Sequence, residues 1–354
     1  MLLDEREGEE IGTGGREDRR VAGRLSGRRV RRLVLRLATV LVTLGFTYVA
    51  LHGIDLSKAW HGLRTSDYWW LAPALLAFAL GNVARALRWR SLFAPGRRPP
   101  LAVTLNAMML GYLYNNILPA RAGEAARIVV LTQRSDAPPV EITGTVLLER
   151  LYDIVAILIV FLVAEPWLAS VSWFGAAAIV AGVLAVVIAT IVSVLVIYGD
   201  RPLRLLLRPL RRLAPVTEEH VERAVAELAH GLSGLHNRRV AAEALLWTLL
   251  AWVMSILCAY LVMLAFHLHV PFWAAVLVVV AVGLSMILPA APASIGVFEG
   301  AALIALKAYG LGRSTALPYA LVLHLVNFVP FVLVGAGLLH YNARHPPRRR
   351  VAAP

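Results

Sequence analysis

The sequence predicts an all-α membrane protein, a polytopic bundle of hydrophobic helices. Of its 354 residues, 59% are hydrophobic and only 16% are charged, whereas soluble domains carry about 25% charged residues. Several apolar runs reach the roughly 20 residues that a helix needs to cross about 30 Å of hydrocarbon. The clearest run, 174–198, contains no charged residue.

Six runs are long enough to span a membrane. They are 33–51, 68–87, 142–164, 174–198, 240–266 and 317–341. Two other runs are interrupted at proline, since 101–118 is followed by 124–133 and 272–288 is followed by 294–309. A ten-residue helix reaches only about 15 Å, so we expect about six full spans plus two broken, re-entrant helical hairpins of opposite orientation. Eight full spans would place the termini on the same side and remain the alternative.

The distribution of arginine predicts the orientation. The formal charge is +13, and most Lys and Arg residues flank the apolar runs, which follows the positive-inside rule and argues against nucleic-acid binding. We expect an inner or plasma membrane location with both termini cytoplasmic. We expect residues 1–32 to form a disordered cytoplasmic tail, 33–341 the transmembrane domain with a cytoplasmic amphipathic segment at 199–239, and 342–354 a basic cytoplasmic tail.

Charges also mark the ends of the second span. A short external loop with Asp55 and Asp67 is expected before it. Four arginines are expected at its cytoplasmic end: Arg88, Arg90, Arg97 and Arg98.

The two interruptions resemble each other, because each contains Ile-Leu-Pro-Ala followed by glycine and glutamate. Broken segments at corresponding places in two halves point to a transporter binding site. Backbone N–H and C=O groups that lose their helical partners at a break must face protein or water. We therefore expect a polar interior at the break residues, which are Pro119, Gly123, Pro292, Ser294 and Gly296. Prolines that merely kink helices, with arginines reaching the interface, are the alternative.

Charged groups within the spans each require a partner or water, because a charge at a helix centre costs about 2.5–3.5 kcal/mol on insertion scales. The candidates for substrate binding are Arg121, Glu124, Arg127, Glu149, Arg150, Asp153 and Glu299, followed by Arg85, Asn116, His324 and Asn327. Glu149 and Asp153 share a helix face, and Arg150 can pair with Asp153. An internal ion-pair network and a substrate contact are both compatible with this spacing.

Two further patterns concern ligands. Arg121 and Arg127, beside the N-terminal ends of the helical pieces, are suited to a phosphate. His324 and Asn327 lie three residues apart and either face one cavity or bond to a neighbouring helix.

The sequence carries no soluble-enzyme motif. One cysteine, Cys258, excludes an intrachain disulfide, and His267 and His269 lack a nearby carboxylate. We therefore expect no catalytic residue, no cofactor and no metal. A membrane enzyme using Asp55, Asp67, Glu149 or Asp153 remains the alternative.

Three stretches, 116–127, 149–153 and 292–299, resemble signatures of the lysylphosphatidylglycerol synthase transmembrane-region family, which is described as flippase-like. The resemblance covers about 33–341. It implies a lipid translocase acting on a polar-headed, phosphate-containing lipid, as in the membrane half of the bacterial aminoacyl-lipid synthases. Since few residues follow the last span, we do not expect the aminoacyltransferase activity of those synthases.

One departure concerns the second break, where the family commonly has adjacent glycines and this chain has Ala293 and Ser294. We expect Ser294 to cap the following helix.

Membrane lipids are the expected partners. A glycosyltransferase or other enzyme acting on a lipid-linked substrate, and a structural partner recruited through 199–239, remain alternative functions, and the sequence leaves a homo-oligomer or a separate lipid-modifying enzyme open.

Overall fold

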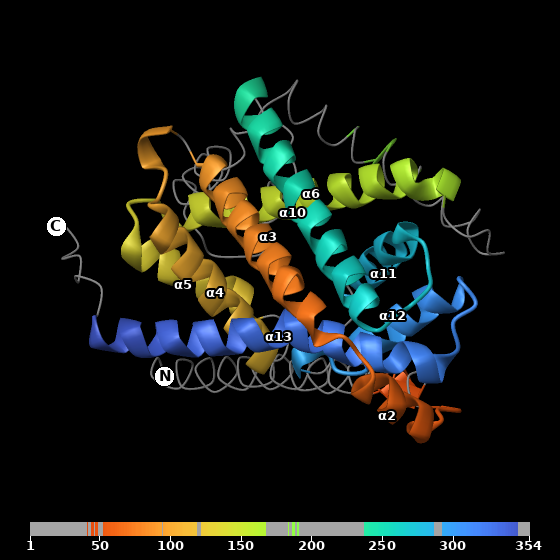
Figure 1. Cartoon of the computed structure of the whole chain (residues 1–354). Helices are drawn as coiled ribbons and strands as arrows, with labels where there is room; N and C mark the ends of the chain where they lie inside the picture. The colour runs from red at the N-terminus through yellow and green to blue at the C-terminus, as the bar shows by residue number, and fades with distance from the viewer. Residues whose placement is uncertain are drawn as a thin grey trace, which may run out of the picture.

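A computed structural model describes residues 41, 44–45, 47–48, 52–93, 95–118, 122–167, 183, 186–187, 190, 237–286 and 292–345. All regular elements in these ranges are helices (Figure 1). They are α2 (Leu56–Arg64), η1 (Tyr68–Trp70), α3 (Leu71–Ser91), η2 (Pro95–Arg97), α4 (Leu101–Ile117), α5 (Ala122–Arg134), α6 (Pro139–Ala164), η4 (Glu165–Trp167), α10 (Arg238–Ala265), α11 (Phe272–Ser285), η7 (Pro292–Ser294), α12 (Val297–Lys307) and α13 (Arg313–Arg344).

Several predicted segments lie outside the described residues. These are the tail 1–32, almost all of the spans 33–51 and 174–198, the amphipathic segment up to 236, the centres of both breaks, and the tail from 346 onward.

Three described helices are long and apolar enough to cross a membrane: Tyr68–Ser91, α10 and α13. The 28 residues of α10 reach about 42 Å at 1.5 Å per residue, more than the hydrocarbon thickness of about 30 Å. The helices α3 and α10 lie side by side (Figure 1). Gly81 lies where they approach closely, since a Cβ added there would lie 3.2 Å from Cβ of Met254.

The helices α4 and α5 form a tight antiparallel pair around the first break. An added Cβ at Gly123 would lie 1.9 Å from the carbonyl oxygen of Gly111, so only glycine fits. The Gly123 N–H also donates to Oδ1 of Asn115 at 2.9 Å, which satisfies a free donor at the start of α5. The predicted short helix after the break is present, and the side chain of Asn115 caps it.

The second broken segment consists of α11 and α12, which pack together. Between them η7 contacts α4, so the second break reaches the first helix pair. Ala293, Ser294 and Gly296 have φ of 60°, 57° and 80°, and α12 begins only at Val297 with Gly296 as its N-cap. The prediction that Ser294 caps this helix is wrong, because its backbone is left-handed two residues before the cap.

The segment between the first two spans contains a helix rather than a simple loop. Asp55 caps α2 by accepting the N–H of Ser57 at 3.0 Å and that of Lys58 at 3.2 Å. The N–H of Asp55 donates to Ser314 Oγ at 2.9 Å, which attaches α2 to the start of α13. The last helix accordingly begins at Arg313, four residues before the predicted start.

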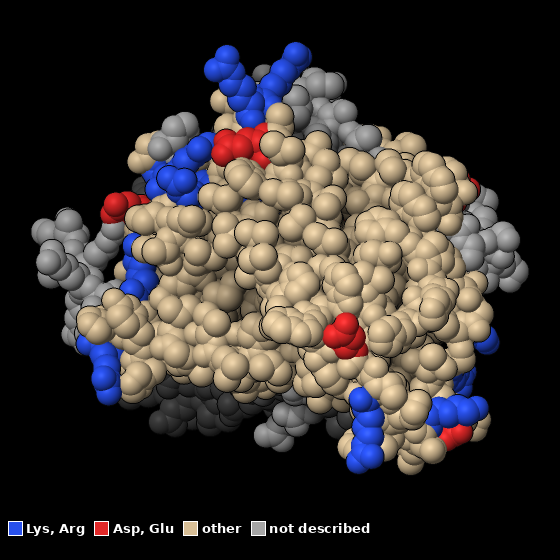
Figure 2. All heavy atoms as spheres, in the orientation of Figure 1, with Lys and Arg blue, Asp and Glu red and all other residues tan. Residues whose placement is uncertain are grey.

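The outer surface is apolar between charged ends. Figure 2 shows Lys and Arg mainly near the upper end, along one edge and at the lower corners of the molecule, with a broad, mostly uncharged area between them. Large side chains in the long helices are well exposed, including Leu76 at 61%, Leu246 at 65% and Leu333 at 68%. Contiguous apolar surface of this kind indicates contact with lipid.

Candidate functional site: a buried ion network

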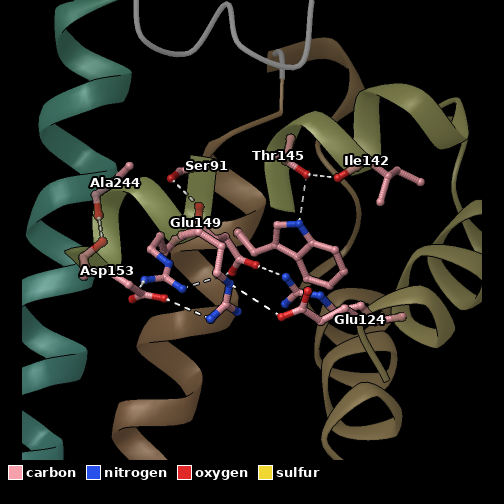
Figure 3. Close-up of polar contacts among 12 residues, drawn as sticks. Ser91, Glu124, Ile142, Thr145, Glu149, Asp153 and Ala244 are labelled. Carbon is pink, nitrogen blue, oxygen red and sulfur yellow. Dashed lines mark hydrogen bonds and ion pairs between the residues drawn. The ribbon is translucent and has the colours of Figure 1, made fainter. Parts of the chain in front are cut away.

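Arg88 of α3 occupies the centre of a polar network inside the bundle. Only 3% of its side chain is exposed, and its Nη1 donates to Asp153 Oδ1 at 2.5 Å while its Nη2 donates to Glu149 Oε1 at 3.1 Å (Figure 3). Glu149 and Asp153 lie one turn apart on α6, as their spacing predicts. Arg88 lies in the last turn of α3, at the end of the span as predicted, but its guanidinium points into the bundle.

Glu149 joins three helices. Its second carboxylate oxygen accepts a hydrogen bond from Nη2 of Arg127 on α5, and its side chain is 1% exposed. The guanidinium of Arg127 lies 4.7 Å from the ring centroid of Trp89, a cation–π contact. The indole Nε1–H of Trp89 in turn donates to Thr145 Oγ1 at 3.0 Å. Arg127 is thus held from two sides, by a carboxylate and an aromatic face.

At the outer edge of the network the ion-pair distances are longer and the side chains are more exposed. Arg150 lies 3.7 Å from Glu124 and 3.8 Å from Asp153, and its side chain is 47% exposed. Glu124 is 35% and Asp153 22% exposed. The predicted pairing of Arg150 with Asp153 is confirmed. Three arginines face three carboxylates, so the network is formally neutral, with tight contacts on its inner side and long ones at its edge.

Glu299 and His324 form a second polar centre at the second break. Glu299 Oε2 accepts the N–H of Gly296 at 2.8 Å, and Oε1 lies 2.6 Å from Nδ1 of His324. His324 Nε2 lies 2.9 Å from the carbonyl oxygen of Ala293. Since a carbonyl only accepts, a hydrogen bond at this position is donated by Nε2. The histidine therefore fixes both sides of the left-handed turn.

The remaining candidates are distributed as follows. Arg85 Nη2 donates to Ser255 Oγ at 2.8 Å. Asn327 donates to Leu323 O at 2.8 Å within its own helix, so it does not share the contacts of His324. Asn116 has a buried amide nitrogen that finds no hydrogen-bond partner among the described residues. Pro119 and Arg121 lie outside the described residues.

Sequence reasoning missed Arg88 as a site residue. Positions 81, 85 and 88 follow the spacing of one helix face, and this face contains Gly81, where α3 approaches α10. Arg90 lies off that face and donates to Pro99 O at 3.0 Å. The helical period was thus the signal in the sequence that could have distinguished the buried Arg88 from Arg90.

Long apolar helices around a buried ion network define an integral membrane protein. A family model of the lysylphosphatidylglycerol synthase TM region matches residues 34–335, and the chain belongs to this family. The chain is also 25% identical over 340 residues to a protein named glycosyltransferase AglD of Haloferax volcanii, a match that covers 87% of this chain and 54% of that protein. The chain thus spans about half the length of that relative.

Proposed function

We propose that this protein is a lipid translocase that moves a lipid with a polar, phosphate-containing head group between leaflets. The observation that carries the proposal is the difference in contact distance and burial between the inner side of the ion network and its edge. Its inner contacts, around Glu149, are short and dry, whereas Arg150 at its edge is half exposed and has only long contacts. Charges of this kind in a membrane bundle are typical of substrate pathways.

The two broken segments support the proposal. In it, α4–α5 and α11–α12 are re-entrant hairpins that enter from opposite faces of a bundle of about six spans, with both termini cytoplasmic. The 17 residues of α4 and the 14 of α11 reach only about 26 Å and 21 Å, less than the hydrocarbon thickness. The contact between η7 and α4 places the second break against the first broken segment, which supports a site near the midplane as in transporters with paired broken segments.

In the proposed step, the head group enters at the edge of the network while its tails stay in hydrocarbon. A phosphate oxygen accepts hydrogen bonds from Arg150, replacing the long contact to Glu124, and Glu124 becomes available to a cationic substituent of the head group. Arg88, Glu149 and Arg127 keep their mutual contacts and hold the three helices together. The head group thus exchanges partners with the network without leaving an unpaired charge.

Proteoliposomes test this proposal. The full chain is reconstituted with phosphatidylglycerol labelled on an acyl chain, and the accessibility of the label to external dithionite is followed with time. We expect the wild type to accelerate exchange over empty liposomes, and Arg150→Gln to slow it roughly tenfold or more through loss of a charge-assisted hydrogen bond. Lys58→Gln, at a side chain that is 74% exposed on α2, is the matched control and should behave as wild type.

Two results would count against the proposal. One is a wild-type rate equal to that of empty liposomes. The other is an Arg150→Gln rate equal to that of an active wild type.

A membrane glycosyltransferase acting on a lipid-linked sugar is the second candidate, favoured by the name of the relative. It requires a free carboxylate. Asp55 and Asp67 both cap helices, Asp67 by accepting the N–H of Trp69 at 3.2 Å, and Glu149 and Asp153 are bound to arginines. This candidate predicts a covalent product and abolished turnover in Asp55→Asn or Asp67→Asn.

A further inference from the structure

A cavity of about 160 Å³ lies one helical turn from the ion network, where five helices meet. Most of its wall is apolar, formed by Trp252, Ala259, Val278, Val282, Phe298 and Leu323. Three polar side chains also line it: Arg85 of α3, Ser255 of α10 and Asn327 of α13. A mostly apolar pocket with a few convergent polar groups is typical of a ligand site.

The hydrogen bonds of Arg85 leave most of its donors available. Ser255 donates its only hydroxyl proton to Ala251 O at 2.9 Å, so it accepts from Nη2 of Arg85 at 2.8 Å. The guanidinium folds back toward Gly81, where an added Cβ would lie 3.5 Å from Nη1. Asn327 uses one amide hydrogen on Leu323 O and keeps a second one. The cavity therefore offers donors and few acceptors.

The charge of Arg85 has no carboxylate within ion-pair distance among the described residues. Asp153 is already shared by Arg88 and Arg150, and the network is neutral without Arg85. A guanidinium in an apolar bundle is costly unless an opposite charge accompanies it. One positive charge is therefore left for a ligand.

We propose that this cavity binds the phosphate of an anionic lipid, with Arg85 as its counter-ion and Asn327 as a second hydrogen-bond donor. The choice of a lipid rests on the proposed translocase function, and the site extends the path of the head group from Arg150 into the bundle.

The size of the cavity fits a head group rather than a whole lipid. Pockets for drug-sized ligands measure about 300–1,000 Å³, and this one is about 160 Å³. Gly283 keeps one wall open, because an added Cβ there would lie 3.2 Å from Cη2 of Trp252. The acyl chains must then remain among the apolar walls and the surrounding lipid.

Isothermal titration of the full chain in detergent with dioctanoyl phosphatidylglycerol tests the site. We expect Arg85→Gln to raise the Kd roughly tenfold or more, because a charge-assisted contact is lost. Gly283→Val, which crowds the cavity without changing its charge, should also weaken binding. Arg90→Gln removes an arginine that lies off this face and should keep the wild-type Kd. Arg85 takes part in no described ion pair, so Arg85→Gln should unfold at or above the wild-type temperature.

Three probes separate the sources of the anion. Dioctanoyl phosphatidylglycerol is expected to bind, while dioctanoylglycerol and inorganic phosphate are expected to bind at least tenfold more weakly. Equal binding of dioctanoylglycerol would show that the phosphate is not recognised, and equal binding of inorganic phosphate would show a free-anion site; either overturns the proposal.

The inference and the proposed function fail separately. If the wild type exchanges lipid in proteoliposomes but Arg85→Gln binds phosphatidylglycerol normally, the cavity assignment is wrong. If binding depends on Arg85 but the wild type exchanges no lipid, the site stands and the translocase proposal fails.

Discussion

Replacing Glu149 with glutamine should destabilise the bundle more than any other neutral substitution in the network. The carboxylate is 1% exposed and is the shared partner of Arg88 and Arg127, whose side chains are 3% and 5% exposed. Removing one partner of a buried ion pair costs about 3–5 kcal/mol. An amide can accept from one arginine, but its NH₂ group then faces the other.

The matched control is Arg150→Gln at the exposed edge of the same network. An exposed ion pair contributes about 0–1 kcal/mol, and Arg150 is 47% exposed with its nearest carboxylate oxygen at 3.7 Å. Thermal unfolding of the purified protein in detergent should therefore give a much lower Tm for Glu149→Gln than for Arg150→Gln. Equal Tm values for the two variants would refute the division into a structural inner side and an exchangeable edge.

Two further predictions concern the breaks. Gly123→Ala should prevent α4 and α5 from packing, because the added Cβ would lie 1.9 Å from Gly111 O. Gly96→Ala is the control and should be neutral, because no atom of the described residues lies within 4 Å of an added Cβ there. Similar yields of folded protein for the two variants in size-exclusion chromatography would contradict this prediction. His324→Phe leaves the carboxylate of Glu299 without its nearest side-chain partner and should lower stability by about 1–3 kcal/mol, measured as Tm, with an unchanged Tm as the contrary result.

The regular helices could be predicted from the sequence because apolar length alone specifies them in lipid. The run 240–266 became α10 and 101–118 became α4 within a few residues. The start of the last span was missed by four residues, because Arg313, Ser314 and Thr315 in the first turn of α13 are not apolar, although the predicted span rightly ran through Pro318 and Pro330, which usually interrupt helices. Hydropathy does not report how a proline is accommodated. Here the ring of Pro318 faces Gly62, and a Cβ added to Gly62 would lie 3.4 Å from Cγ of Pro318.

The site was predicted in part. The spacing of Glu149, Arg150 and Asp153 places them on α6 correctly, since it depends only on the helical period. Arg127 was expected to hold a phosphate, yet the structure pairs it with Glu149. This pairing joins residues from separate helices, and the period within each helix does not report which helices become neighbours. The same reason explains why Arg88 was not recognised as a site residue.

The most direct test of the translocase proposal compares sidedness with composition in one measurement. Intact cells with and without this protein are treated with a membrane-impermeant lipid-labelling reagent, and the labelled and unlabelled amounts of each lipid are quantified by mass spectrometry. A translocase predicts that loss of the protein leaves the total amount of every lipid unchanged and lowers the labelled fraction of at least one anionic lipid. Disappearance of a lipid species, or an unchanged labelled fraction for all lipids, would contradict it.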